Sequence, residues 1–226
     1  MKVGLQISSF TWPGGPAAIG PTLARVVRAA DDVGFDSIWV MDHFFQIRGV
    51  GRPEEPMLEG MTALGFMAAH SQRARIGLMV GGVPYRQPGL WLKSATTLDV
   101  LSGGRAWLGI GAAWNREESE ALGFPFPPLG VRFEMLEETL QFAHGMFDGE
   151  LGSEGELRGR HVTATRLLNS PQSLSRPRTF SAPEQTFHFR RLLFSSLATT
   201  LGMSAGSTTT APCRFRTSMA SAITFA

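Results

Sequence analysis

The stretch from Ala29 to His43 reads Ala-Ala-Asp-Asp-Val-Gly-Phe-Asp-Ser-Ile-Trp-Val-Met-Asp-His, and it decides the fold class. Its first part completes a helical pattern that Gly34 ends, and the apolar run Asp36–Met41 that follows predicts a strand. Because the strand is apolar at consecutive positions, we expect both of its faces to be buried, as in a parallel sheet covered by helices. Asp42 and His43 stand where this strand ends.

The same alternation of strand and helix extends to both sides of this stretch. Expected strands are residues 2–7, 36–41, 75–80 and 106–110, and expected helices are residues 21–33, 61–70, 88–101, 116–122 and 132–147. This order indicates an α/β fold with a parallel sheet. A doubly wound open sheet and a (β/α)₈ barrel both agree with the pattern. A whole barrel takes about 250 residues, so 226 residues would hold only a part of one.

The composition is that of a soluble globular protein, with 43% hydrophobic residues. No run reaches the roughly 18 apolar residues of a membrane span, and the first residues read as a strand instead of a signal peptide. The single cysteine, Cys213, excludes an internal disulfide and a cysteine zinc site. We therefore expect a cytoplasmic protein without a membrane partner.

Charge and composition change after Pro177. Residues 1–177 carry 18 acidic and 16 basic side chains, whereas residues 178–226 carry one acidic and five basic ones. The slightly acidic body argues against a nucleic-acid partner. The tail lacks Asp, Asn, Lys, Val, Tyr and Trp, and 16 of its 49 residues are Ser or Thr. We expect residues 1–177 to form a partial β/α barrel and residues 178–226 an atypical, irregular tail.

The candidate site lies at the carboxyl ends of the expected strands, where ligands bind in parallel α/β folds. A histidine at position 43 can transfer a proton near neutral pH, although a structural histidine bonded into the loop fits the sequence equally well. Gly81 and Gly82 end the third strand and indicate either a close approach to a ligand or a plain turn. The histidines show no metal-ligand spacing, so no metal site is expected.

Aromatic residues follow three of the expected strands. They are Phe10 and Trp12 after the first strand, Phe44 after the second and Trp114 after the fourth. If the sheet is parallel, these side chains share one rim, and an aromatic rim suits a flat conjugated ring. Ordinary packing under loops is the alternative for each of them.

Taken together, these motifs resemble the luciferase-like monooxygenase superfamily, and above all the branch that uses the deazaflavin coenzyme F420. The resemblance spans Met1 to Pro177 and rests on the order and spacing of Phe10, Ala29–His43, Tyr85–Pro88, Leu98–Arg105 and Leu108–Trp114. It implies a (β/α)₈ barrel that holds F420, or alternatively FMN, at the carboxyl ends of its strands. The implied activity is hydride transfer or monooxygenation of a small organic substrate.

The resemblance also implies roles for individual residues. Asp42 and His43 would lie against the cofactor ring, with His43 as the catalytic proton donor or acceptor. Residues 79–81 (Met79, Val80 and Gly81) would form a bulge behind the ring, often with a non-prolyl cis peptide, and Ala112 would line the cofactor. Trp114 would line the substrate mouth, and from their place on the shared rim we expect Phe10, Trp12 and Phe44 to contact the substrate with it. Some dehydrogenases of the family have an acidic residue where Trp114 stands and a tryptophan where Ile47 falls, so these departures argue against a sugar-phosphate substrate.

The family pattern stops at Pro177, where a fifth strand would follow. Read in a shifted frame, the codons for residues from about Arg178 onward can encode a family-like sequence, so we hypothesise an out-of-frame translation there. A barrel that stops after four strands has an unpaired edge and an open interior, which predicts weak or absent cofactor binding and either a homodimer or non-specific association. An inactive fragment of such an enzyme and a non-redox α/β ligand-binding module are the alternative functions.

Overall fold

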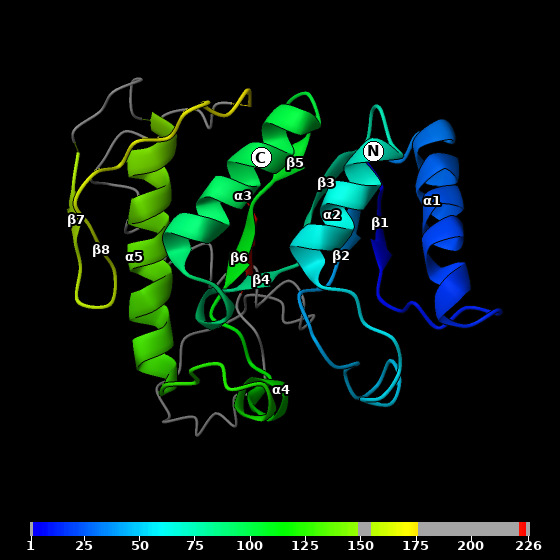
Figure 1. The fold of residues 1–226 in the computed structure, drawn as a ribbon, viewed down its shortest axis with the longest axis horizontal. Coiled ribbons are helices and arrows are strands. Elements are labelled where there is room, and N and C mark those ends of the chain that lie inside the picture. The colour runs from blue at the N-terminus through cyan, green and yellow to red at the C-terminus, as the bar shows by residue number, and fades with distance from the viewer. Residues whose placement is uncertain (1, 149–154, 176–221, 225–226) are drawn as a thin grey trace, which may run out of the picture.

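The computed structural model describes residues 2–148, 155–175 and 222–224. Strands and helices alternate along the first half of the chain, as the sequence predicts (Figure 1): β1 (Gly4–Ile7), α1 (Pro16–Asp32), β2 (Ser37–Val40), α2 (Gly60–Ala69), β3 (Arg75–Leu78), β4 (Gly81–Gly82), the 3₁₀ turn η1 (Val83–Tyr85), α3 (Pro88–Leu101), β5 (Ala106–Trp107) and β6 (Gly109–Gly111). Next come α4 (Arg116–Ala121), α5 (Leu129–Asp148), β7 (Leu157–Arg158), β8 (Thr163–Ala164) and β9 (Ala222–Thr224).

The main sheet has the order β1-β2-β3-β5, and every pair in it is parallel. β4 and β6 continue β3 and β5 after short breaks and pair with each other, again in parallel. The peptide bond between Met79 and Val80, at the break after β3, is cis, as the family resemblance implied. The prediction of a parallel α/β sheet is therefore confirmed.

Strand order and helix placement favour a barrel over a doubly wound sheet. Spatial order follows chain order without the reversal that defines a doubly wound sheet. Right-handed crossovers between strands in this order place all helices on one face. Helices α1, α2, α3 and α5 do lie side by side, each in contact with the next (Figure 1).

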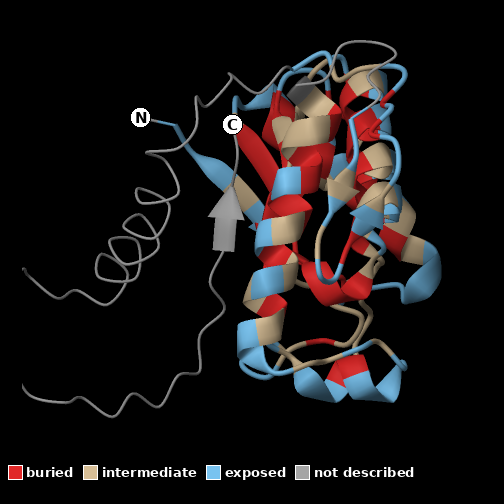
Figure 2. Cartoon of the chain, turned by 90° about the vertical axis from the view of Figure 1, so that its left-hand side faces the viewer, coloured by how far each residue is buried: buried red, intermediate tan, exposed pale blue. Residues whose placement is uncertain are grey.

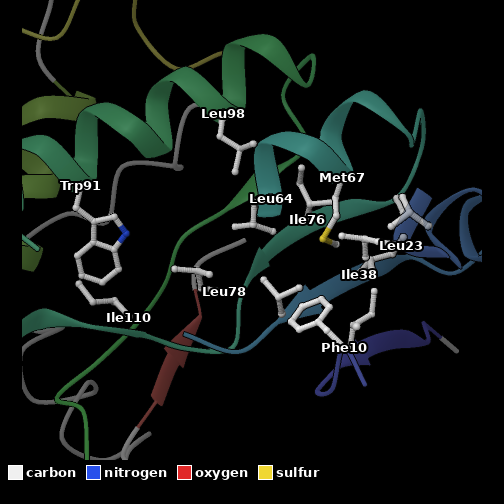
Figure 3. Close-up of a cluster of buried hydrophobic side chains, with 14 of the residues drawn as sticks. Phe10, Leu23, Ile38, Leu64, Met67, Ile76, Leu78, Trp91, Leu98 and Ile110 are labelled. Carbon is white, nitrogen blue, oxygen red and sulfur yellow. The ribbon is translucent and has the colours of Figure 1, made fainter. Parts of the chain in front are cut away.

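The main core fills the space between these helices and the sheet (Figure 3). Its fully buried side chains come from α1, β2, α2, β3, α3 and β6, and they include Leu23, Ile38, Leu64, Met67, Ile76, Trp91 and Ile110. Burial of such a side chain contributes roughly 1.5–3 kcal/mol. Buried residues gather where helices meet the sheet, whereas exposed residues lie on the outward sides (Figure 2).

Two tryptophans cover the opposite face of the sheet. Trp39 alternates with the core residue Ile38 along β2, so it points to the other side. Its ring meets the ring of Trp107 at a centroid distance of 5.4 Å, and its Nε1 donates a hydrogen bond of 2.9 Å to Ser37. A Cβ atom on Gly77 would lie 2.7 Å from the Trp39 ring. The glycine therefore makes room for indole packing on the face that a closed barrel turns inward.

Two buried acidic residues fix loops at the ends of helices. Asp31, the penultimate residue of α1, accepts hydrogen bonds of 2.6–3.1 Å from the backbone amides of residues 72–74. Asp99 in α3 accepts amide hydrogen bonds of 2.7 and 2.9 Å from Leu174 and Ser175. Burial raises the pKa of each carboxyl, but hydrogen bonds outweigh burial, so both have a pKa below the ordinary value. For Asp31 these are the bonds from the backbone amides, and for Asp99 they are the bonds from the Ser173 and Ser175 hydroxyls together with the two amides. Asp99 thereby fixes the last residues that precede position 176.

The prediction of an unpaired strand edge is wrong for β6. β9 pairs with β6 in the antiparallel direction, with Ile223 opposite Ile110. Backbone groups on a strand edge that would otherwise be unpaired gain partners in this way. The expected tail lies mostly outside the described residues, and of it the structure describes residues 222–224, which form β9.

Other differences are local. α1 begins at Pro16, five residues before the expected start, because proline is well accommodated at the first position of a helix. The antiparallel hairpin of β7 and β8 was not predicted, because its strands have only two residues each and show no period.

Candidate functional site at the carboxyl ends of the strands

Three segments meet beyond the carboxyl ends of the strands, at the lower side of Figure 1. They are the long loop between β2 and α2, the segment from the end of β3 through β4 and η1, and the segment from the end of β6 through α4. Every candidate site residue predicted from the sequence belongs to these segments or to the loop after β1.

Glu118 is the centre of the arrangement, and its side chain is fully buried. One carboxylate oxygen, Oε1, lies 2.6 Å from His43 Nδ1 and accepts a hydrogen bond of 2.9 Å from the Tyr85 hydroxyl. The other oxygen, Oε2, accepts hydrogen bonds of 2.9 and 3.2 Å from the backbone amides of Phe44 and Phe45. Four partners surround the carboxylate, which satisfies a buried charge that would otherwise be very costly.

These contacts determine the ionisation of Glu118 and Tyr85. Burial raises the pKa of Glu118. The hydrogen bond and charge of His43, together with the hydrogen bonds from the two backbone amides, lower the pKa by more than burial raises it, so it lies below its ordinary value. Burial and the adjacent Glu118 charge both raise the pKa of Tyr85 well above its ordinary value. Glu118 is therefore an anion at neutral pH, and Tyr85 is a neutral phenol that donates to it.

His43 bridges this buried cluster and the surface of the rim. Its side chain is 12% exposed, and its ring meets the edge of Trp114 at a centroid distance of 5.3 Å. Trp114 itself is 44% exposed. Within the described residues Nε2 of His43 forms no hydrogen bond, whereas Nδ1 is bound to Glu118. The ring can therefore accept or donate a proton at Nε2 while Glu118 compensates its charge.

Asp42 lies beside His43 in the sequence but is buried in a different cluster. Its two oxygens accept hydrogen bonds of 2.6 and 2.7 Å from Arg86, and Oδ2 also accepts one of 3.0 Å from the backbone amide of Gly82. Arg86 donates to Glu59 as well. Burial lowers the pKa of Arg86, but the two carboxylates raise it by more than burial lowers it, so the guanidinium stays charged. Both oxygens of Asp42 are thus engaged by protein groups.

The predicted aromatic residues do not form one cluster. Trp114 contacts His43, whereas Phe44 packs against Tyr85 and Phe124 at centroid distances of 5.3 and 4.8 Å. Phe10 is 2% exposed and belongs to the main core, where its ring meets that of the half-buried Trp12 at 5.8 Å. Trp114 is thus the predicted substrate contact that the structure places beside the predicted catalytic histidine.

The residues after β3 and β6 have different environments. Met79 is 38% exposed, and Val80 is half-buried. A Cβ atom on Gly81 would lie 2.2 Å from the ring of Trp91, so protein packing already requires a glycine there. Ala112 is buried, and its carbonyl accepts a hydrogen bond of 3.0 Å from Arg132.

Arg132 also donates to the carbonyl of Ala113, a residue with a φ of +58°. This is the left-handed region, which side chains other than glycine seldom adopt. The arginine therefore holds the turn that carries Trp114 toward His43. Within residues 2–148 and 155–175, no cluster of three or more His, Cys, Asp or Glu side chains could bind a metal ion.

Sequence reasoning assigned no role to Glu118, Tyr85, Arg86 or Arg132. Glu118 belongs to the run Arg-Glu-Glu-Ser-Glu, which reads as a solvated helix, and its neighbours Glu117 and Glu120 are indeed exposed. Tyr85 is the only tyrosine of the chain, and a lone tyrosine beside a predicted site is a signal that could have been used.

The family model for the luciferase-like monooxygenases matches residues 1–185. The chain belongs to the luciferase-like monooxygenase family. Among the curated relatives of this chain is F420-dependent glucose-6-phosphate dehydrogenase from Amycolatopsis mediterranei. The two are 30% identical over 152 residues, which cover 66% of this chain and 43% of the relative. The 4-hydroxyprotoasukamycin monooxygenase of Streptomyces nodosus is 32% identical over 151 residues, or 65% and 38% of the two chains.

This luciferase-like chain spans about two fifths of the length of those curated relatives. Among solved structures, monooxygenase RslO1 from Streptomyces bottropensis has a TM-score of 0.63 and 20% identity, over 78% of this chain and 51% of the other. The coenzyme F420-dependent tetrahydromethanopterin reductase from Methanopyrus kandleri has a TM-score of 0.61 and 19% identity, over 77% and 47%. The described fold therefore corresponds to about half of those folds.

No helix in the described part of the chain is both long enough and apolar enough to span a membrane.

Proposed function

We propose that this chain provides the proton-transfer side of an oxidoreductase site that uses coenzyme F420, with FMN as the alternative, and acts on a small organic substrate. The observation that carries the proposal is the pair of His43 and Glu118 beside Trp114: a proton-carrying imidazole backed by a buried carboxylate, next to an exposed indole. Similarity to F420-dependent relatives supports the choice of cofactor.

The residues present fit the ring of such a cofactor. Large apolar side chains stay exposed at the carboxyl ends of two strands, with Met79 at 38% and Trp114 at 44%. A flat ring with apolar faces and a polar edge covers such a surface favourably, and its edge can meet a single polar group. On this proposal Met79 and Trp114 would contact the ring or the substrate, and His43 would face a polar edge.

The bound cofactor would supply the hydride chemistry. The residues of this chain would position the ring, exclude water and move one proton at His43 Nε2. Glu118 would stabilise the imidazolium after His43 accepts that proton, as a carboxylate partner does in other histidine sites. Asp42 and Arg86 would hold the loop that carries His43, because both contribute to the buried ion pair beneath it.

Fluorescence titration with F420 and, separately, with FMN tests this proposal. We expect saturable binding with a dissociation constant above about 1 μM, which corresponds to a binding free energy weaker than about −8 kcal/mol. Trp114→Leu is expected to weaken binding at least several-fold. Leu101→Ala is the matched control, because Leu101 is 79% exposed at the end of α3, which leads into the amino end of β5, away from the carboxyl ends of the strands. No saturation with either cofactor up to about 100 μM would contradict the proposal.

We also propose that the family-like part ends near Pro177 and that residues from about Arg178 onward are read out of frame. The change in composition after Pro177 and the family-like reading in the shifted frame support this idea. The family model extends to residue 185, slightly past this boundary. The gene sequence around codon 177 tests it, because a single frame that is continuous and family-like on both sides of that codon would disprove the shift.

A further inference from the structure

The two carboxylate oxygens of Glu118 face two different kinds of hydrogen-bond partner. Oε2 faces the backbone amides of Phe44 and Phe45, which can only donate. Oε1 faces His43 Nδ1 and the Tyr85 hydroxyl, which can each act as donor or acceptor. One side of the carboxylate is therefore fixed by the backbone, and the other side can respond to a change in its partner.

An ionised carboxylate can only accept hydrogen bonds, so it requires donors on both sides. Glu118 is fully buried at 0% exposure, and its nearest donors are those four groups. In the next charged pair, the charges of Asp42 and Arg86 neutralise each other through two hydrogen bonds. His43 satisfies Glu118 only when Nδ1 carries the proton, and this leaves Nε2 of the neutral ring with a lone pair.

We propose that Glu118 is a positioning residue that fixes the neutral ring of His43 in the Nδ1-protonated form and presents Nε2 as a proton acceptor at the rim. Tyr85 is the second positioning residue, because its hydroxyl satisfies the same oxygen and keeps it in place. The use of that proton acceptor in catalysis rests on the proposed function. The tautomer itself is a property of this chain without a cofactor.

The variant Glu118→Gln tests the idea sharply, because the amide has nearly the same shape but one of its ends is a donor. If the amide nitrogen faced Phe44 and Phe45, it would oppose two backbone donors that cannot change. The favourable orientation instead places the amide nitrogen toward His43 and Tyr85, whose Nδ1 and hydroxyl oxygen can accept. The proton of the neutral His43 ring must then move from Nδ1 to Nε2.

Nitrogen-15 chemical shifts of labelled histidine report the tautomer directly. The spectra are recorded on the full chain without cofactor, at a pH where the ring is neutral, and His43→Gln identifies the signal among the five histidines. We expect a protonated Nδ1 in the wild-type chain and a protonated Nε2 in Glu118→Gln. In Tyr85→Phe the proton is expected to stay on Nδ1, because Glu118 remains ionised.

Glu117→Gln and Glu120→Gln are matched controls on the same helix, since both side chains are exposed and neither contacts His43. A protonated Nε2 in the wild-type chain would overturn the inference, and so would an unchanged tautomer in Glu118→Gln. The wild-type spectrum remains decisive if the variant does not fold. Failure of cofactor binding in the titrations would count against the proposed function and leave this result intact.

Discussion

Asp42 and His43 are neighbours in the sequence, but they turn to opposite environments. Asp42 is 3% exposed, and Arg86 occupies both of its oxygens. His43 keeps one nitrogen toward the rim and the other on Glu118. The two side chains differ in this way because successive residues of an extended chain point to opposite sides. The acidic residue therefore stabilises the loop, and the histidine is the group that can exchange a proton.

The first residue-scale prediction concerns this buried ion pair. In Asp42→Asn the guanidinium of Arg86, whose side chain is 12% exposed, loses its main counter-charge. Removal of one partner of a buried pair costs about 3–5 kcal/mol, and we expect a loss of that order in the free energy of unfolding measured with urea. The control Glu120→Gln breaks an exposed pair with Arg116 and should cost less than about 0.5 kcal/mol. Equal losses in both variants would contradict the prediction.

The second residue-scale prediction concerns acid. The pKa of Glu59 falls to about 2, despite the opposing effect of burial, because of Arg86 and the amide of Thr62, and the pKa values of Asp31 and Glu118 are lowered too. A carboxyl whose folded pKa is below its unfolded value, about 4, stabilises the fold above that value and loses this contribution as pH falls toward the folded pKa. The free energy of unfolding should therefore decrease from about pH 5 to pH 2.

Urea titrations at a series of pH values measure this dependence, and Asp31→Asn should flatten it by removing one of the contributing carboxyls. A free energy of unfolding that stays constant or rises below pH 5 would disprove the prediction.

At the scale of elements, the sequence predicted the strands and helices wherever apolar runs decide them. β2, buried at all four positions, and α3 were predicted within two residues of their observed bounds. The break between β5 and β6 was not predicted. A Cβ atom on Gly109, directly after the break, would lie 2.0 Å from the carbonyl oxygen of Leu78, a residue distant in sequence, and no local pattern signals such packing. Glu118 was missed for the same reason: its burial arises from His43 and Tyr85, which no local pattern connects to α4.

Two glycines in neighbouring elements should respond in opposite ways to alanine. Gly65 lies within α2 with no atom near its Cβ position, so Gly65→Ala should stabilise the fold by roughly 0.5–1 kcal/mol through helix propensity. Gly77 lies in β3, where a Cβ would be 2.7 Å from both Trp39 and the carbonyl of Trp107. Gly77→Ala should therefore cost about 1–3 kcal/mol. Thermal unfolding of both variants measures the difference, and a stabilised Gly77→Ala would refute the packing described here.

At the scale of the whole molecule, the described strands follow one another in the order of a barrel, and within the described residues helices α1, α2, α3 and α5 line up on one face of the sheet. The opposite face carries Trp39 and Trp107, and the outer edge of β6 carries β9. Strand edges left open are a common route to association, so the pairing between β6 and β9 has a consequence for solution behaviour. The sequence could not indicate it, because the last residues of the chain show no strand period.

The substitution Ile223→Pro tests this pairing without shortening the chain. Proline removes a backbone N–H from β9 and disfavours a place within a ladder, so the register of Ile223 with Ile110 should be lost. We expect faster amide hydrogen exchange at residues 109–111 and a larger average mass in light scattering, because the freed edge of β6 can pair with another copy. Ile223→Val is the matched control, since it keeps the backbone donor. If the proline variant exchanges and scatters like the valine variant, β9 does not protect this edge, and association of the chain must then arise from another surface, such as the face that carries Trp107.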